Sequence, residues 1–250
     1  MKRTLGCIRK ADTDFALIEP GDRVAVGLSG GKDSLLLLEA LRLYRLFSHK
    51  DYSLCAITVD PGYQFDPSPL AHYCAQAGIP FHFRPGAVVQ TANERAKAGK
   101  SPCPLCAKMR RGVLNSAAAE LGCNKVALGH HRDDALETFL LSMFYEGRLN
   151  TLAPKSKMER AGVTVIRPLL YLEERHIRGA VRTLGLPVQP PVCPFDGHTQ
   201  RQTMKDFLAD LRKTFPRADE MMFFALHNTN GYHLWDRYQS LTGKEEPSCK

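Results

Sequence analysis

The chain has 250 residues, of which 44% are hydrophobic and 24% charged, as in soluble globular proteins that bury a sizeable core. It contains no apolar stretch long enough to cross a membrane and no apolar signal segment behind its basic first residues. We therefore expect a cytoplasmic protein with no membrane partner. The formal net charge of +8 suits a nucleic-acid partner, although a basic, solvated surface gives the same charge.

Hydrophobic patterns predict strands that alternate with helices. The predicted strands are 23–28, Ser53–Val59, Phe81–Arg84, 125–128 and 163–167. The predicted helices are 32–47, 68–77, 108–121, 133–145, 173–184, 203–214 and 217–226. This alternation predicts an α/β fold: a parallel five-stranded, Rossmann-like sheet with helices on both faces.

Polar motifs follow three of the predicted strands directly. They are Ser29-Gly30-Gly31 after the first strand, Asp60 after the second and Gly129-His130 after the fourth. Because the carboxyl ends of parallel strands lie at one edge of a sheet, where ligands bind near the switch in strand order, these motifs predict one common site.

The first motif extends into the string Ser29-Gly30-Gly31-Lys32-Asp33-Ser34. The two glycines allow a sharp turn that presents N–H groups to an anion, and the following helix adds its N-terminal dipole. Lys32 adds a positive charge, and Asp33 adds an oxygen suited to the Mg²⁺ that accompanies nucleotide phosphates. The common P-loop is excluded, because Val26 stands where it needs glycine. An ordinary glycine-rich turn is the alternative.

The run from Leu128 to Asp134 leads from a strand into a helix. Asp133 or Asp134 is a candidate N-cap, since a carboxylate favours the positive end of a helix. The histidines and aspartates also suit a metal site. A third interpretation, nucleotide and substrate handling at the sheet edge, fits the position best and is compatible with capping.

The pair Cys103-x-x-Cys106 precedes the predicted helix that carries Arg110 and Arg111, a setting that favours thiolates. A third cysteine, Cys193, lies in a proline-rich loop. Three thiolates suit a metal or an iron–sulfur cluster, zinc would need a fourth ligand such as His198, and a redox pair is also open. No function is assigned to the other cysteines, and Cys55 is expected to be a core residue. They are Cys7, Cys55, Cys74, Cys123 and Cys249.

Together these motifs resemble the tRNA 2-thiocytidine synthetase family, within the N-type ATP pyrophosphatase (PP-loop) superfamily. The strings that carry the resemblance are SGGKDS, PLCAKMRRG, ALGHHRDDALETFLLSMFYEGRL, VIRPL, and a cysteine followed by Gln200-Arg201-Gln202. The resemblance covers roughly residues 15–226. The chain departs from the family pattern at Pro190, where members often carry a further cysteine.

The resemblance implies an ATP- and Mg²⁺-dependent enzyme that adenylates the C2 oxygen of a cytidine at position 32 of a tRNA anticodon loop. Sulfur, supplied ultimately by a cysteine desulfurase, then replaces that oxygen, and AMP and pyrophosphate are released. It also implies a [4Fe–4S] cluster on Cys103, Cys106 and Cys193, with one iron open to hold sulfide. The same chemistry on another nucleoside or a small molecule remains an alternative, as does a non-enzymatic nucleotide- and cluster-binding sensor. The sequence leaves a homodimer open.

On this basis each residue receives an expected role. Catalytic roles fall to Lys32, Asp33, Arg110 and Asp134. Nucleotide binding falls to Ser29, Gly30, Gly31, Lys32, Asp33, Ser34, Asp60, Gly129 and His130. We expect the PP-loop domain, with the CxxC segment, at 1–190 and a helical extension with the third cysteine at 191–250.

Some residues to which these roles are not assigned are candidates for RNA contacts. Basic residues of the C-terminal half, Arg201 and Lys205 among them, suit phosphates. Phe144 and Tyr145 would suit stacking on a base, but their helical spacing favours packing in the core.

Overall fold

The computed structural model describes residues 1–86, 88–95, 102–193 and 200–228. The chain divides into two units, Met1–Phe207 and Leu208–Lys250. His198 and Cys249, which the sequence analysis considered, lie outside the described residues. Within the described part, no helix combines the length and the apolar character needed to cross a lipid bilayer.

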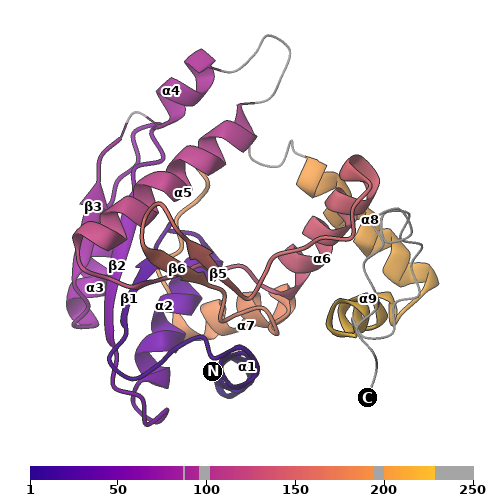
Figure 1. Cartoon of the computed structure of the whole chain (residues 1–250), viewed down its shortest axis with the longest axis horizontal. Coiled ribbons are helices and arrows are strands. Elements are labelled where there is room, and N and C mark those ends of the chain that lie inside the picture. Colours follow the sequence, from indigo (N-terminus) through magenta and orange to yellow (C-terminus); the bar gives the residue numbers. More distant parts are fainter. Residues whose placement is uncertain (87, 96–101, 194–199, 229–250) are drawn as a thin grey trace, which may run out of the picture. The chain divides into compact units, whose positions relative to one another are not determined.

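The first unit contains one six-stranded sheet (Figure 1). Its strands are β1 (Arg23–Gly27), β2 (Ser53–Val59), β3 (Phe81–Arg84), β4 (Lys125–Ala127), β5 (Lys155–Met158) and β6 (Val163–Ile166). The order across the sheet is β3-β2-β1-β4-β6-β5, and every neighbouring pair is parallel except β5 with β6. The predicted parallel α/β fold is confirmed, but the expected number of five strands is wrong.

The additional strand, β5, is a polar edge strand. It pairs antiparallel with β6 alone, and Lys155 and Lys157 are exposed along it. A strand with one partner and little buried surface needs few apolar residues, and lysines on an edge discourage pairing with other chains. Its sequence, KSKM, therefore gave no hydrophobic signal.

Most helices lie close to the predicted positions. They are α1 (Lys2–Phe15), α2 (Lys32–Tyr44), α3 (Ser68–Gln76), α4 (Val88–Arg95), α5 (Cys103–Glu120), α6 (Arg132–Leu141), α7 (Glu174–Leu184), α8 (Gln200–Thr214) and α9 (Ala218–His227), with a π-helical turn, η1 (Ser142–Glu146), after α6. Two helices, α1 and α4, were not predicted from the sequence. In α1 the buried positions Thr4, Ile8 and Ala11 are spaced for one helical face but are diluted by charged residues.

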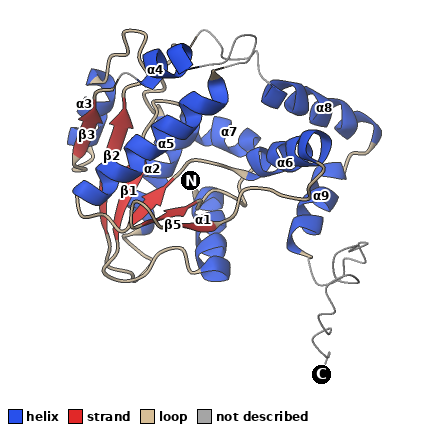
Figure 2. Ribbon diagram, turned by 45° about the horizontal axis from the view of Figure 1, so that its top comes forward, coloured by secondary structure: helices blue, strands red, loops and turns tan. Residues whose placement is uncertain are grey.

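Alternation along β1 divides the core between the two faces of the sheet. Val24 and Val26 face a cluster that includes the fully buried leucines of α2 and residues of α1, α3 and α7. Ala25 faces the opposite way, toward Leu114 and Ala118 of α5. In Figure 2, α5 crosses one face of the strands, with α2 on the other side. Both faces are covered, as expected for parallel strands.

Candidate functional site

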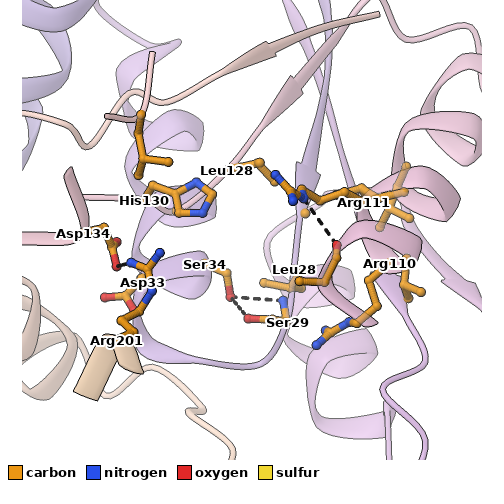
Figure 3. Close-up of a pocket in the computed structure, with 17 residues that line it drawn as sticks. Leu28, Ser29, Asp33, Ser34, Arg110, Arg111, Leu128, His130, Asp134 and Arg201 are labelled. Atoms are coloured by element: carbon orange, nitrogen blue, oxygen red, sulfur yellow. Dashed lines mark hydrogen bonds and ion pairs between the residues drawn. The ribbon is translucent and has the colours of Figure 1, made fainter. Parts of the chain in front are cut away.

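The strand order reverses between β1 and β4, and a cavity of about 470 Å³ opens beside the ends of these two strands. In open α/β sheets this is where ligands bind. Seven of the predicted site residues line the cavity: Ser29, Asp33, Ser34, Arg110, Gly129, His130 and Asp134 (Figure 3). Four others, Gly30, Gly31, Lys32 and Asp60, are not among the lining residues. Asp60 accepts a hydrogen bond from the Gly62 N–H at 2.8 Å and so stabilises the turn after β2.

The loop between β1 and α2 is held by its own hydrogen bonds. The Ser34 hydroxyl donates to the Gly31 carbonyl at 2.9 Å and lies 3.1 Å from both the backbone nitrogen and the hydroxyl of Ser29. Gly30 has φ +83°, a conformation that side chains other than hydrogen disfavour. Much of the loop geometry is therefore encoded within six residues, and the Gln189 N–H adds a hydrogen bond to the Gly30 carbonyl at 3.0 Å.

Gly129, at the end of β4, touches this loop. A Cβ atom on Gly129 would lie 2.9 Å from the carbonyl carbon of Asp33 and 3.0 Å from the backbone nitrogen of Ser34. These are backbone atoms, so no side chain can move aside to make room. Glycine at this position allows the end of β4 to pack directly against the start of α2.

Lys32 and Asp33 form an ion pair at the start of α2, with the Lys32 ammonium 2.9 Å from Asp33 Oδ2 and 3.1 Å from Glu174 Oε1. Although burial opposes the charge, Asp33 and Glu174 raise the pKa of Lys32, which stays protonated. The other oxygen, Asp33 Oδ1, is buried and accepts no hydrogen bond from the described residues, and His131 Nε2 lies 3.7 Å from it. A buried carboxylate oxygen without a partner is a ready ligand for a hard cation.

The N-cap of α6 is His131, which corrects the expectation that Asp133 or Asp134 caps this helix. His131 Nδ1 accepts from the Asp134 N–H at 3.4 Å, and Asp134 Oδ2 accepts from the His131 N–H at 2.9 Å. The Asp133 carboxylate instead accepts from the Glu174 N–H at 2.8 Å, at the start of α7. In a capping box two side chains each accept a hydrogen bond from the other residue's backbone N–H. Here His131 takes the N-cap position and Asp134 the third helical position.

His130 is neutral in this setting. Burial lowers the pKa of His130 to about 4. Asp134 raises this pKa by less than burial lowers it, and Arg167, Arg201 and Arg111 lower it further. Its Nδ1 is buried and has no partner among the described residues. A neutral imidazole in the cavity wall offers one donor and one acceptor to a bound polar group.

Three arginines reach the cavity wall: Arg110 and Arg111 from α5, and Arg201 from α8. Arg201 lies 3.2 Å from Asp134 and 3.3 Å from Glu137, and also donates to the Thr138 hydroxyl. Burial raises the pKa of Glu137 to about 7, aided by Asp134 and opposed by Arg201. The sequence analysis did not assign Glu137 or Glu174 to the site, and no local pattern marks either residue.

The CxxC pair forms the first turn of α5, which corrects the prediction that it precedes a helix beginning at residue 108. The first turn of a helix tolerates proline, so Pro102 and Pro104 are compatible with a helix that begins at Cys103. Burial raises the pKa of Cys106, Arg110 opposes that rise, and Cys193 and Cys103 add to it, so the three thiols lie within electrostatic range. Among the described residues, no three His, Cys, Asp or Glu side chains are arranged to hold a metal ion.

Two aromatic residues contradict the sequence expectation. Phe144 and Tyr145 in η1 are 52% and 55% exposed, not core residues. The π-helical turn changes the angular spacing of side chains, so the apolar face of α6 does not continue through them. Phe144 packs edge-to-face on Phe207 of α8, with ring centroids 5.8 Å apart.

The fold and the loop at the strand switch define a PP-loop protein, and the family model of the PP-loop domain matches residues 7–188. Among solved structures, the chain is similar to the U34-tRNA thiolase NcsA of Methanococcus maripaludis with its [4Fe-4S] cluster, at 24% identity and a TM-score of 0.73 over 100% of this chain and 80% of that one. At this identity the likeness shows the fold alone.

Curated relatives are nearer in sequence. A tRNA-cytidine(32) 2-sulfurtransferase of Geobacter metallireducens is 40% identical over 233 residues, which are 92% of this chain and 91% of the relative. The protein of the same name from Neisseria meningitidis serogroup A is 40% identical over 94% of this chain and 74% of its own length. The chain therefore belongs to the PP-loop family and, within it, to the tRNA 2-thiocytidine synthetases, which are enzymes.

Proposed function

We propose that this enzyme is an ATP-dependent tRNA sulfurtransferase that adenylates the C2 oxygen of cytidine 32 in the anticodon loop and replaces it with sulfur. The observation that carries the proposal is the cavity at the strand switch, which joins an anion-binding loop, three arginines and an unpartnered carboxylate oxygen. The names of the relatives supply the base and its position.

The triphosphate of ATP would lie against the Ser29–Ser34 loop and the N-terminus of α2. Backbone N–H groups and the helix dipole favour an anion there, and the hydroxyls of Ser29 and Ser34 add donors. Mg²⁺ would be held by Asp33, whose Oδ1 has no hydrogen-bond partner in the part of the chain that the structure describes, together with phosphate oxygens. When bound, the ion neutralises charge on the phosphates.

Adenylation turns a poor leaving group into a good one. The C2 carbonyl oxygen of cytidine leaves only with difficulty, whereas the same oxygen leaves readily as part of AMP. Charge grows on the α-phosphate and on the departing pyrophosphate, and Arg110, Arg111 and Arg201 line the cavity where that charge would develop. The neutral His130 is available to hydrogen-bond the base or a phosphate oxygen.

The three cysteines suit an iron–sulfur cluster in the chemistry of their donors, and Cys106 lies within electrostatic range of the other two. We assign Cys103, Cys106 and Cys193 as its ligands. When bound, the cluster would supply sulfide to the activated base at an iron without a protein ligand. Ala107 and Arg110, one and four residues after Cys106, line the cavity, which supports proximity between the cysteines and the nucleotide. A cysteine desulfurase is the class of enzyme that would provide this sulfur.

RNA as the substrate is supported by the net charge of +8 and by the relatives' names. A tRNA-modifying enzyme would work in the cytoplasm. The base must leave its stack to reach the cavity, as for other enzymes that act on bases. The same chemistry on a free nucleoside or a small molecule is the second candidate, because the cavity supports a nucleotide but does not distinguish an RNA from a smaller substrate.

The test is a reaction of the anaerobically purified, cluster-loaded enzyme with ATP, Mg²⁺, sulfide and an anticodon stem-loop. We expect AMP, pyrophosphate and 2-thiocytidine, and a fall in turnover of about 10²-fold or more for Lys32→Ala and for Asp33→Ala. Lys2→Ala, which removes an exposed lysine from α1, is the matched control. Formation of ADP and phosphate would assign another class of ATP chemistry. Equal thiolation of free cytidine and of the stem-loop would favour the second candidate.

A further inference from the structure

The carboxylate of Glu174 is shared by three cations from three helices. Glu174 Oε1 lies 3.1 Å from the Lys32 ammonium and 2.9 Å from the Arg178 guanidinium, and Glu174 Oε2 lies 2.8 Å from the Lys205 ammonium. Lys32 belongs to the phosphate loop and α2, Arg178 to α7, and Lys205 to α8. All four residues lie in the first unit of the chain.

This carboxylate is largely removed from water, since only 10% of its side chain is exposed. It also occupies the first position of α7, where the helix dipole favours a negative charge. Although burial opposes ionisation, Lys205, Arg178 and Lys32 hold the pKa of Glu174 far below its ordinary range. Glu174 therefore carries one negative charge and contacts three cations, so one cation can leave while the carboxylate keeps two.

Lys32 is turned toward the carboxylates and is absent from the cavity lining. To neutralise a bound triphosphate, the Lys32 ammonium has to exchange Glu174 for phosphate oxygens. Stripping a buried carboxylate of its one cation is strongly destabilising, because it leaves an uncompensated buried charge. Here Arg178 and Lys205 remain on Glu174 after Lys32 has left, so the exchange avoids that cost.

We propose that Glu174 is a positioning residue that holds Lys32 beside the phosphate loop before a triphosphate binds, and that Lys205 and Arg178 allow Lys32 to leave Glu174 when it binds. The inference rests on the proposed binding of ATP. Through Lys205, helix α8 would then control nucleotide affinity indirectly, and the carboxylate of Glu174 would carry this effect.

The proposal predicts opposite effects from the two sides of the same ion pair. Without Lys205, Glu174 depends more heavily on Lys32 and retains it against the phosphates. Lys205→Met should therefore weaken triphosphate binding although Lys205 never touches the nucleotide. Without the Glu174 charge, Lys32 is released, and the loss of Lys205 should then have no effect.

The experiment measures the dissociation constant of α,β-methylene-ATP, which resists cleavage between the α and β phosphates, by calorimetry with Mg²⁺. We expect at least a fivefold weaker complex for Lys205→Met, binding no weaker than wild type for Glu174→Gln, and the Glu174→Gln value for the double variant. Adenosine, which lacks phosphates, should bind all of these proteins equally. Lys213→Met, which removes an exposed lysine from the same helix, is the control.

Arg178→Met keeps Glu174 in place and should weaken the complex in the same direction, so the test survives if Glu174→Gln does not fold. A Lys205→Met effect that persists in the Glu174→Gln background would mean direct contact between Lys205 and phosphate, and would overturn the proposal. Unchanged affinity in Lys205→Met and Arg178→Met, or a large loss in folded Glu174→Gln, would overturn it as well. Failure of the wild-type enzyme to bind the analogue would instead refute the proposed function.

Discussion

The phosphate loop and the cysteine region differ in how much of the chain each needs. The loop is closed by hydrogen bonds among Ser29, Gly31 and Ser34, within one strand–loop–helix unit. The cysteines come from two segments, with Cys103 and Cys106 in the first turn of α5 and Cys193 far along the chain beyond α7. The first region is a local structure, whereas the second exists only once the whole sheet is assembled.

Ion pairs, beside the apolar packing of α5 against β1, connect the two regions. Arg201 and Lys205, on the helix that follows Cys193, reach Asp134, Glu137 and Glu174, which surround the loop. Ion pairs of this kind exchange partners more readily than an interdigitated core. We therefore expect the phosphate loop to be rigid and the contacts of the segment after Cys193 to be more adjustable.

The largest effect should come from the cysteines. Cys103→Ser, Cys106→Ser or Cys193→Ser should remove iron and acid-labile sulfide from the anaerobically purified protein and abolish thiolation. Binding of α,β-methylene-ATP should survive, because the loop is closed by its own hydrogen bonds. Iron analysis, the visible spectrum and calorimetry measure the three properties. Cys7→Ser, whose parent thiol donates to the Tyr171 carbonyl, is the control. One zinc and no iron in the wild-type protein would contradict this assignment.

The next effect concerns Glu137, which lies where Arg201 of α8 meets α6. Glu137 is 3% exposed, and burial raises the pKa of its carboxyl from 4.5 to about 7. Between these values the folded protein holds a proton that the unfolded chain has released, so stability falls as the pH rises from about 4.5 to about 7. The difference of 2.5 pKa units corresponds to about 3 kcal/mol.

Glu137→Gln removes this titration. Urea unfolding at several pH values should show the variant gaining on the wild type by up to about 3 kcal/mol between pH 5 and pH 8. A constant difference between the two proteins across this range would mean that Glu137 is ionised throughout and that Arg201 outweighs the burial.

Sequence reasoning recovered the local side of the comparison well. The loop, the strands before it and the helix after it follow from periodicity and glycine placement within a short stretch, so their positions at one sheet edge were predictable. Arg201 was noted only as a candidate for RNA-phosphate contacts, and its place in the cavity wall was not predicted. Glu174 carries no local pattern at all, because its meaning arises from cations on two other helices.

Other errors have the same origin in missing tertiary context. The edge strand β5 needs no apolar face, so periodicity was silent there. The start of α5 was predicted five residues too late, at residue 108, although the first turn of a helix accepts the prolines found there. Phe144 and Tyr145 were expected inside because a continuous α-helix would have turned them inward, and a π-helical turn does not.

Gly129→Ala tests the rigid side. The added methyl group would meet backbone atoms of Asp33 and Ser34 at 2.9 and 3.0 Å, so the loop has to shift. We expect binding of α,β-methylene-ATP to weaken about tenfold, or about 1.4 kcal/mol, with the cluster retained. Gly6→Ala, at an open position in α1, is the matched control and should leave binding unchanged. Unaltered affinity in Gly129→Ala would mean that the nucleotide does not depend on the packing of β4 against the loop.

The smallest effect should come from the exposed aromatics of η1. Asp134 lines the cavity, and Phe144 lies ten residues further along α6 and η1, about 15 Å away at the helical rise. That distance suits an unpaired base two or three nucleotides from one held in the cavity, and exposed rings stack on bases of any identity. Phe144→Ala and Tyr145→Ala should each weaken anticodon stem-loop binding by about 1 kcal/mol, roughly fivefold, without altering nucleotide affinity. Fluorescence anisotropy of a labelled stem-loop measures the loss, and Phe47→Ala, which removes a similarly exposed ring from the turn after α2, is the control. An equal loss in Phe47→Ala would show that η1 has no special part in holding RNA, and the aromatic surface would then belong to another partner.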